Sequence, residues 1–506
     1  MDLTKKTARN SLYNLLAFVY PIILSLFATP FIIHKIGTEN YGIFALATSF
    51  VGFLAFVDFG ISPALVKYVA EYSARGEDEK VNRFFSTSVI FYALVGTLVG
   101  LGIIAFGATI APQVFKVSAH NTQNLRVVFY WTGIGFVFTM LLAAYASLPG
   151  ALQRFDIPSR ISVVINTVSV GISVLLVTFG HGVVSLMALT TILSAASVLV
   201  FRYFDRKLVS GLKVAFKFDK DVVHKLFVFG GFATIGTIGG TILFQLDKVL
   251  IGARLGAQPV AFYVVPGNIA TKINAAVATI TAVIFPLSAE LLAREEHTKL
   301  QALYTRSTRI VLTFLVIFVT PMIVLSHAFL LQWLGADYAA KSTLIMQLLL
   351  VTYSILGLSN IATHLTVGVN KPQVAALVGI FLGGLNIALL YILMPRYGII
   401  GAAWAFLLSV IPILLFIFYV ERQILHLRTI SFYFDTARKL YGPFLLNLAV
   451  PFVLKSYIHS FAVFLLVYVV SVGVSSAALF VFRSLDPNDR ELINAVFKKL
   501  SSGKAG

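Results

Sequence analysis

The sequence predicts an all-α integral membrane protein with about fourteen transmembrane helices. Of its 506 residues, 58% are hydrophobic and only 12% are charged, which is too few to cover a water-soluble surface. Apolar runs of about 18 residues or more recur along almost the whole chain, and about 20 helical residues cross the hydrocarbon core of a bilayer. The chain therefore has no room for a separate globular domain.

Hydropathy divides the chain into three sets of spans. The first set lies near 11–33, 41–66, 85–111, 127–149, 161–179 and 183–203. The second set lies near 226–251, 259–287, 310–331, 343–369, 373–394 and 399–419. Two further spans lie near 441–458 and 460–482. The first run is too long for the core of a signal peptide, so we interpret it as a span.

The net charge of +18 follows from membrane topology. Lys and Arg concentrate in the N-terminal segment, in alternate loops and in the tail, as they do in cytoplasmic segments, because translocating them is unfavourable. This distribution predicts an inner-membrane protein with both termini in the cytoplasm. We expect the charges to meet the lipid bilayer and not nucleic acid.

An internal repeat relates the first six spans to the next six at an offset of roughly 218 to 220 residues. Gly150 matches Gly368 at the start of a short turn, and Asn166 matches Asn386 within the following span. An even number of spans in each copy gives both halves the same orientation. The sequence therefore predicts two parallel six-helix lobes plus two extra C-terminal helices.

The predicted domains follow from this repeat. They are an N-terminal six-helix lobe at 1–203, a basic cytoplasmic linker at 204–225, a C-terminal six-helix lobe at 226–420, a cytoplasmic loop at 421–440, two additional transmembrane helices at 441–482 and a cytoplasmic amphipathic tail at 483–506. In the tail, Leu492, Ile493, Val496 and Phe497 share one helical face, which is typical of a helix that lies on the anionic inner leaflet.

Several stretches resemble a known family. The longest is FATPFIIHKIGTENYGIFALATSFVGFLAFVDFGISPALVKYVAEY, from Phe27 to Tyr72, which resembles the start of the Wzx-type polysaccharide flippases. Further similar stretches are LQRFDIPSRI at 152–161, FQLDKVLIGARLG at 244–256, WLGADY at 333–338 and GVNKP at 368–372. The resemblance covers about the first 420 residues, and the order of its motifs is more specific than any one of them.

This resemblance implies membership of the superfamily that also contains the multidrug and toxin extruders and the lipid II flippases. It implies two lobes around a central cavity, alternating access, and an undecaprenyl-pyrophosphate oligosaccharide as cargo. Polysaccharide polymerases or ligases are then expected partners. Many such flippases have twelve spans, so the two extra spans are a departure that resembles the lipid II flippases and leaves the sugar of the cargo open.

Lys272 is the strongest candidate for a cargo-binding residue. It lies about 13 residues into its predicted span, or about 20 Å along a helix, too deep for its ammonium group to reach the outer surface easily. We expect it to face a water-filled cavity and to bind the cargo or take part in proton coupling, because charge in hydrocarbon is costly. The alternative is a structural ion pair.

Asp58 and Asp247 are the carboxylates that lie clearly inside predicted spans. Either could couple an ion gradient to movement of the lobes. Asp58 precedes Gly60 and Pro63, which should break the helix, so it could instead bond to freed backbone groups. Asp247 lies near the outer end of its span, where a structural bond within the lobe is the alternative.

A group of cations lies where the repeat-related spans meet the cytoplasm. Each one could be an ordinary positive-inside residue, but together they could attract the pyrophosphate to the inner mouth before flipping. They are Arg83, Arg154, Arg160, Arg306, Arg309 and Lys371. Five glycines, at 230, 231, 236, 239 and 240, indicate either close helix packing or a bending hinge in the seventh span.

Other functional classes fit less well. A membrane-embedded glycosyltransferase or polymerase would present catalytic groups on a sizeable loop, and the predicted outer loops are short, so we expect a transporter and not an enzyme. Gly503 and Lys504 lack the upstream glycine and following hydroxyl of an ATP-binding loop. A multidrug or small-cation antiporter of the same fold is the strongest alternative, and a lipid II flippase and a non-transporting scaffold also stay open.

Overall fold

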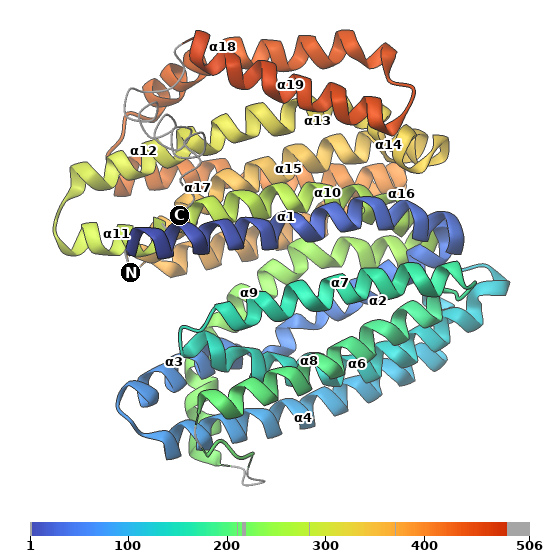
Figure 1. Cartoon of the computed structure of the whole chain (residues 1–506), viewed down its shortest axis with the longest axis vertical. Helices are drawn as coiled ribbons and strands as arrows, with labels where there is room; N and C mark the ends of the chain where they lie inside the picture. The colour runs from blue at the N-terminus through green and yellow to red at the C-terminus, as the bar shows by residue number, and fades with distance from the viewer. Residues whose placement is uncertain (1–2, 210, 215–218, 283, 370, 483–506) are drawn as a thin grey trace. The chain divides into compact units, whose positions relative to one another are not determined.

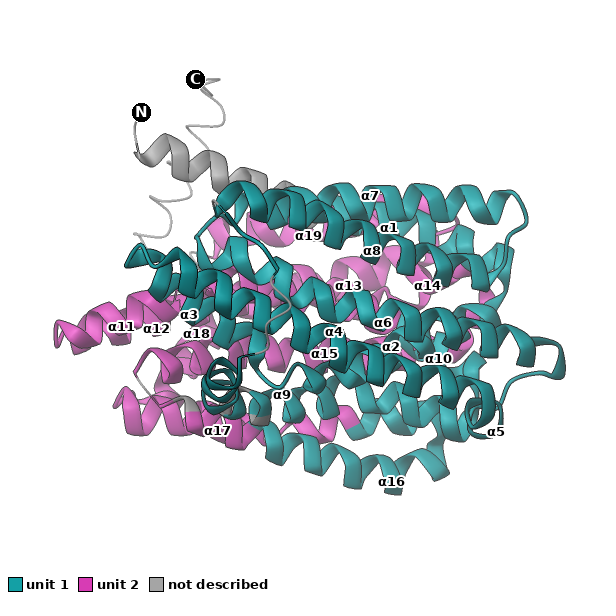
Figure 2. Ribbon diagram, turned by 90° about the horizontal axis from the view of Figure 1, so that it is seen from below, with its two compact units in different colours: residues 1–265, 379–405 teal, residues 266–378, 406–506 magenta. Residues whose placement is uncertain are grey.

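The computed structural model describes residues 3–209, 211–214, 219–282, 284–369 and 371–482, and every regular element in these residues is a helix. They form two compact units, coloured separately in Figure 2. Unit 1 comprises residues 1–265 and 379–405, and unit 2 comprises residues 266–378 and 406–506. The two units do not begin and end at the residues predicted for the two lobes, and the lobes stay a prediction. The amphipathic tail predicted at 483–506 lies outside the described residues.

Unit 1 begins with the N-terminal elements shown in blue to green in Figure 1. Its elements are α1 (Leu3–Ile36), α2 (Thr38–Phe53), η1 (Leu54–Asp58), α3 (Ile61–Ala74), α4 (Asp78–Thr109), α5 (Ala111–Val114), η2 (Ala119–Asn121), α6 (Thr122–Ala151), α7 (Asp156–Thr178), α8 (Val183–Leu208) and α9 (Lys220–Leu255). It also contains the first part of α10 (Ala257–Thr281) and the middle of α16 (Pro372–Val410).

Unit 2 contains the remaining parts of α10 and α16. Its other elements are α11 (Ile284–Ala293), α12 (His297–Phe314), η3 (Leu315–Val319), α13 (Thr320–Val324), α14 (Ser326–Leu334), α15 (Ala336–Gly368), α17 (Ile413–Tyr419), η4 (Val420–Ile424), α18 (Thr429–Leu454), η5 (Lys455–Tyr457) and α19 (Phe461–Val481).

In unit 1, α4, α6 and α8 lie side by side (Figure 1). Small residues allow the first two helices to approach closely, as is common where lipid supplies no hydrophobic driving force between helices. A Cβ atom on Gly100 would lie 2.6 Å from the Gly133 carbonyl oxygen, which is too close for any side chain. Stacked rings of Phe115 and Phe129, with centroids 5.8 Å apart, fill the space beyond this contact.

In unit 2, α18 and α19 pack against each other and against the helices that follow α12. The element η3 is a π-helix, whose irregular hydrogen bonding leaves carbonyl groups to be satisfied from elsewhere. Asn447 on α18 is fully buried and donates a hydrogen bond of 2.8 Å to the Val316 carbonyl oxygen. The C-terminal helix pair is therefore attached to unit 2 by a buried polar bond as well as by apolar packing.

By length and composition, ten helices of the described chain could cross a membrane, or eleven if the two parts of α9, bent by 63°, form one span. This result confirms an all-α membrane protein, but it does not confirm the count of fourteen. With the bent α9 counted as one span, the difference between eleven and fourteen arises at three places. Residues 20–36 count only as a short apolar helix, α18 is not counted, and the predicted spans at 373–394 and 399–419 fall within a single range.

The last of these ranges turns back on itself at Gly398. Gly398 has φ 57° and ψ −137°, a backbone conformation that no helical residue adopts. The backbone of Gly401 then touches the carbonyl group of Leu393, although residues eight apart in a straight helix are separated by about 12 Å. The chain therefore reverses here, as the two predicted spans require.

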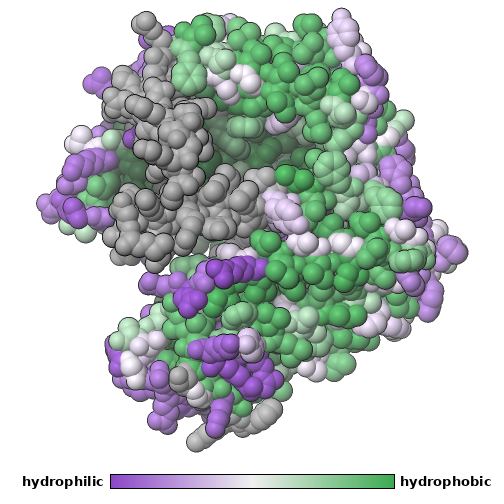
Figure 3. Space-filling model, in the orientation of Figure 1, coloured by the Kyte–Doolittle hydropathy of each residue, from purple (hydrophilic) through white to green (hydrophobic). Residues whose placement is uncertain are grey.

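Large hydrophobic side chains lie on the outside of the molecule as well as in its core. Figure 3 shows hydrophobic residues over most of the visible face, with hydrophilic residues gathered toward its margins. The exposed residues include Val168 and Leu175 on α7 and Phe179 directly after it. A surface of this kind is stable in hydrocarbon and not in water.

Candidate functional site: buried acids and a cationic pocket

The break predicted after Asp58 is present in unit 1. The element η1 ends at Asp58, and α3 begins at Ile61 after two residues with positive φ, Phe59 at 51° and Gly60 at 68°. A Cβ atom on Gly60 would collide with the carbonyl group of Gly230 on α9, so the two backbones touch. Glycine at position 60 therefore permits both the turn and the contact.

Among the residues that the structure describes, the hydrogen bonds to Asp58 come from side chains and not from the freed backbone groups. One of its oxygens accepts a hydrogen bond of 2.7 Å from the Ser62 hydroxyl and another from the phenol of Tyr92 on α4. The two hydroxyl oxygens lie 2.9 Å from each other. Tyr92 is fully buried and Asp58 is half-buried. The cluster bridges the helix break and presents an ionisable group at the level of a membrane span.

Asp247, on α9, is 2% exposed and is satisfied within unit 1. Its oxygens accept a hydrogen bond of 2.6 Å from the Tyr263 hydroxyl and one of 2.8 Å from the Lys248 backbone N–H. The Lys248 ammonium group instead donates to the Phe244 carbonyl oxygen at 2.6 Å and to the Gln245 side chain at 3.0 Å. These bonds favour the structural interpretation of Asp247 over ion coupling.

Arg83 has an acidic partner in the segment before α9. Its guanidinium group pairs with Asp219, which also caps α9 by accepting hydrogen bonds from the N–H groups of Asp221 and Val222. The hydrogen bond from Arg83 holds the pKa of the Asp219 carboxyl below its usual value. The ion pair of Arg83 and Asp219 therefore connects the linker before α9 to the start of α4.

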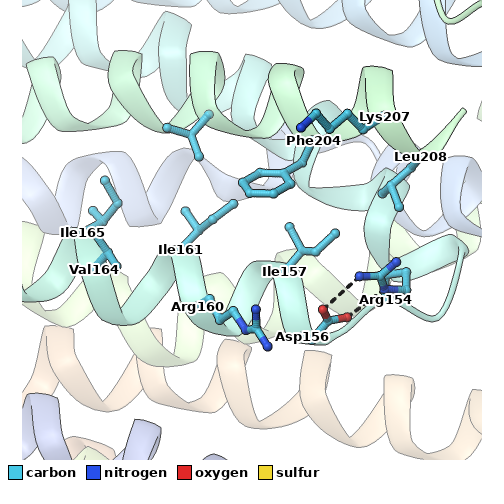
Figure 4. A pocket seen from close by; sticks show the side chains of 11 residues that line it. Arg154, Asp156, Ile157, Arg160, Ile161, Val164, Ile165, Phe204, Lys207 and Leu208 are labelled. Atoms are coloured by element: carbon cyan, nitrogen blue, oxygen red, sulfur yellow. Dashed lines mark hydrogen bonds and ion pairs between the residues drawn. The ribbon is translucent and has the colours of Figure 1, made fainter.

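Arg154 and Arg160 lie at a pocket of about 490 Å³ between the start of α7 and the end of α8 (Figure 4). Arg154 bonds to Asp156 through two nitrogens, at 2.9 and 3.0 Å. Lys207 approaches from α8, and the walls between these charges are apolar. The pocket joins a cationic rim to a hydrophobic interior.

Lys272 lies on α10 within unit 2, and its side chain is exposed. Among the described residues it has no hydrogen-bond or ion-pair partner, so the structural ion pair finds no support there. In the same unit, Asn274 accepts a hydrogen bond of 3.0 Å from Asn360 on α15. Asn274 therefore places a second polar side chain on α10, about half a helical turn after Lys272.

The remaining predicted cations belong to unit 2 and are not among the residues that line the pocket. Arg306 and Arg309 are half-buried on α12, three residues apart and hence on one face. Lys371 is exposed just before α16. The structure therefore divides the predicted cations between two units. No three His, Cys, Asp or Glu side chains gather as a metal site in the part of the chain that the structure describes.

Two buried acids were missed by the sequence analysis, because hydropathy ended each span too early. Asp205 was assigned to the linker, but it lies on α8, fully buried, with no hydrogen bond to either oxygen among the described residues. Glu421 was assigned to a loop, but it lies in η4, also fully buried. The helical spacing could have indicated the burial of Asp205. Ser197 and Phe201 precede it at intervals of four residues, lie on the same face of the helix and are also buried.

Comparison with known proteins gives consistent results. A family model described as polysaccharide biosynthesis protein matches residues 7–292, more than half of the chain. A putative O-antigen transporter of Shigella flexneri is 23% identical over 409 residues, covering 80% of this chain and 94% of the relative. A probable low-salt glycan biosynthesis flippase of Haloferax volcanii is 24% identical over 408 residues, covering 79% of this chain and 80% of the relative.

Two groups of solved structures share the fold. The lipid II flippase MurJ in an inward closed conformation aligns with a TM-score of 0.69 at 18% identity, covering 95% of this chain and 99% of MurJ. An inward-facing multidrug transporter of the MATE family aligns with a TM-score of 0.64 at 12% identity, covering 80% of this chain and 96% of that one. At these identities the likeness concerns the fold alone.

Proposed function

Because this chain belongs to the polysaccharide biosynthesis protein family, we propose that it flips an undecaprenyl-pyrophosphate-linked oligosaccharide from the cytoplasmic to the outer leaflet. The family match, which agrees with the Wzx-type resemblance, is the observation that carries the proposal. It is supported by the names of two relatives, a putative O-antigen transporter and a probable glycan flippase. In this proposal the chain is a transporter and not an enzyme, and polysaccharide polymerases or ligases use its product.

The proposed orientation places both termini on the cytoplasmic side of the inner membrane, as the distribution of Lys and Arg favours. Single cysteines in this cysteine-free chain test it directly. A cysteine at Lys220 should react with an impermeant reagent only from the cytoplasmic side, and one at Lys341 only from outside. Reaction of both from the same side contradicts the orientation.

Lys272 is the residue that we propose to meet the cargo. An exposed lysine in the middle of a span would be unfavourable by about 2.5 to 3.5 kcal/mol if it faced hydrocarbon, so a hydrated cavity is its favourable environment. A primary ammonium group there can bind a pyrophosphate oxygen or take part in proton coupling. Its lack of a described ionic partner leaves the charge available for either role.

The acids and the other cations receive different roles in this proposal. Asp58 is the proposed coupling carboxylate, because it is half-buried at a helix break and two hydroxyl groups surround it. Asp247 and Arg83 have structural partners, so we give them no part in transport. The cations that we propose to attract the pyrophosphate to the inner mouth are Arg154, which is paired with Asp156, and Arg306, Arg309 and Lys371.

A flipping assay in reconstituted vesicles tests the proposal on Lys272. Lys272→Ala should lower the transport rate of lipid-linked oligosaccharide at least about tenfold while the protein accumulates normally, since a hydrated charge contributes little to helix packing. Lys272→Arg should retain more transport than Lys272→Gln if charge is what matters. Lys35→Ala, at the exposed end of α1, is the matched control.

The same vesicles discriminate the alternatives. Wild-type protein that moves lipid II but no other lipid-linked glycan would be a lipid II flippase. Protein that moves a cationic drug against a proton gradient and no glycolipid would be an antiporter of the same fold. Normal flipping by Lys272→Ala would leave the flippase standing and remove Lys272 from its site.

A further inference from the structure

The pocket between α7 and α8 carries uncompensated positive charge. Its only acid, Asp156, is engaged by Arg154. Arg160 makes no ion pair among the described residues, and the Lys207 ammonium group lies 4.4 Å from the centroid of the Tyr203 ring. The pocket thus has three cations against one carboxylate, Asp156, whose charge interacts with Arg160 as well as with Arg154, and its net positive charge makes it an anion site.

The interior of the pocket is apolar and continues along the surface of unit 1. Figure 4 shows Ile157, Ile161, Val164 and Ile165 of α7 beside the charged rim, with Phe204 of α8 opposite. From Val164 at the pocket, exposed apolar residues recur along α7 to its C-cap residue at intervals of three or four, which keeps them on one face. They are Val164, Val168, Ile172, Leu175 and Phe179. This stripe extends about 22 Å, most of the thickness of a hydrocarbon core.

We propose that this pocket binds an anionic phospholipid of the cytoplasmic leaflet. The phosphate group lies between Arg160 and Lys207, and an acyl chain follows Ile161 and the apolar stripe of α7. A basic pocket between spans on the cytoplasmic side is a typical site for such a headgroup. A volume of about 490 Å³ lies within the range of about 300 to 1,000 Å³ usual for small-molecule sites.

The lining residues favour a phospholipid over the glycolipid cargo. A sugar is bound through its hydroxyl groups, which need both hydrogen-bond donors and acceptors. None of the eleven lining residues is Asn, Gln, Ser, Thr, Tyr or Trp. The pocket offers charge for a phosphate and hydrocarbon for a chain, and its one acceptor side chain, Asp156, is already engaged by Arg154. The proposal therefore does not depend on the proposed flippase function.

Native mass spectrometry of the full-length, delipidated protein tests this proposal. The probes are dioleoyl phosphatidylglycerol and, as a zwitterionic comparison, dioleoyl phosphatidylcholine. The double variant R160Q/K207Q should retain about 10- to 30-fold less phosphatidylglycerol at equal lipid concentration, with phosphatidylcholine unchanged. The matched control R294Q/K299Q removes the same charge from exposed residues of unit 2 and should retain lipid as the wild type does.

A second variant separates the pocket from diffuse charge. Val164→Trp fills the pocket from an exposed position without changing the charge, and it should lower retention of phosphatidylglycerol at least about fivefold. Equal loss in R160Q/K207Q and the control, or full retention by Val164→Trp, overturns the proposal. Displacement by inorganic pyrophosphate at equal concentration would indicate a soluble anion, and tighter binding of a lipid-linked oligosaccharide would indicate a cargo site. Either result also overturns it.

Discussion

Replacing Glu421 by alanine should destabilise unit 2 strongly, because this carboxylate is the shared acceptor for two phenols. Tyr304 on α12 donates to Glu421 Oε1 at 2.9 Å, and Tyr433 on α18 donates to the same oxygen at 2.8 Å. Glu421 is fully buried and Tyr304 is 1% exposed, so water cannot replace the lost acceptor easily. The three side chains therefore join η4 to α12, which is distant in sequence, and to α18, which follows η4 along the chain.

The expected magnitude follows from the bonds that are broken. A buried polar group left without a partner costs about 1 to 3 kcal/mol, so orphaning the buried Tyr304 phenol should cost about that much in Glu421→Ala, and the half-buried Tyr433 should add less. Glu421→Gln keeps an acceptor oxygen and should cost about 1 to 2 kcal/mol, because a neutral acceptor forms weaker hydrogen bonds. Its new N–H groups would replace Oε2, which has no hydrogen-bond partner among the described residues.

The assay measures the midpoint of thermal unfolding in detergent. Unfolding is detected as the fall in the fraction of protein that still elutes in its folded form. The comparison that decides the argument uses a Tyr304→Phe/Tyr433→Phe background, in which no phenol is left to be orphaned. There Glu421→Ala should cost much less than in the wild type, and the difference is the coupling energy. If the loss is the same in both backgrounds, the reasoning is refuted.

The remaining predictions concern unit 1. Gly60→Ala should lower the free energy of unfolding by at least about 1 to 2 kcal/mol, because it adds strain in the left-handed conformation and a clash with the Gly230 backbone. Thermal unfolding measures this loss, and the control is Gly171→Ala, which adds a methyl group in open space on α7. Because Arg83 lowers the pKa of Asp219, their pair adds stability above the unfolded pKa of about 3.9 and loses it as pH falls through the lower folded value. Arg83→Gln should abolish this acid dependence, measured by hydrogen exchange at the start of α9; an unchanged pH profile would show that the pair adds nothing.

The sequence pattern predicted those features that depend on local chemistry. Apolar runs predicted the membrane class, and the glycine at 60 predicted the break after Asp58, because both follow from the properties of single residues and their neighbours. The reversal between the spans at 373–394 and 399–419 was also predicted. A count based only on length and composition does not register it, although Gly398 has the backbone conformation of a turn.

Helix ends were harder to predict, because hydropathy falls at a charged residue whether or not the helix stops there. Asp205 and Glu421 each follow an apolar run, so the pattern assigned both to loops. In the structure the helix continues, and the packing of neighbouring helices buries the acid. Burial of this kind depends on tertiary contacts that no local window contains.

The partners of the candidate cations were not predictable either. Arg83 pairs with Asp219, 136 residues away, whereas Arg154 pairs with Asp156, two residues away. The second pair could be proposed from sequence, but the first depends on how the linker meets α4. There the Asn82 side chain accepts a hydrogen bond from the Lys213 backbone N–H. Arg83, which the sequence analysis counted as available for cargo, is thus paired within the fold.

The close backbone contacts of α9 have a consequence for the biosynthesis of this protein. Gly60 meets Gly230 on α9, and Gly239 on α9 meets the backbone at Gly379 on α16, so each of these surfaces is made before the helix that it receives. Unit 1 is complete only when residues 379–405 have been made. At about 5 to 20 residues per second, the N-terminal helices wait on the order of ten seconds or more with a glycine-lined surface exposed to lipid. A nascent chain stalled after α8 should therefore be a substrate for membrane quality control and not a stable half-protein.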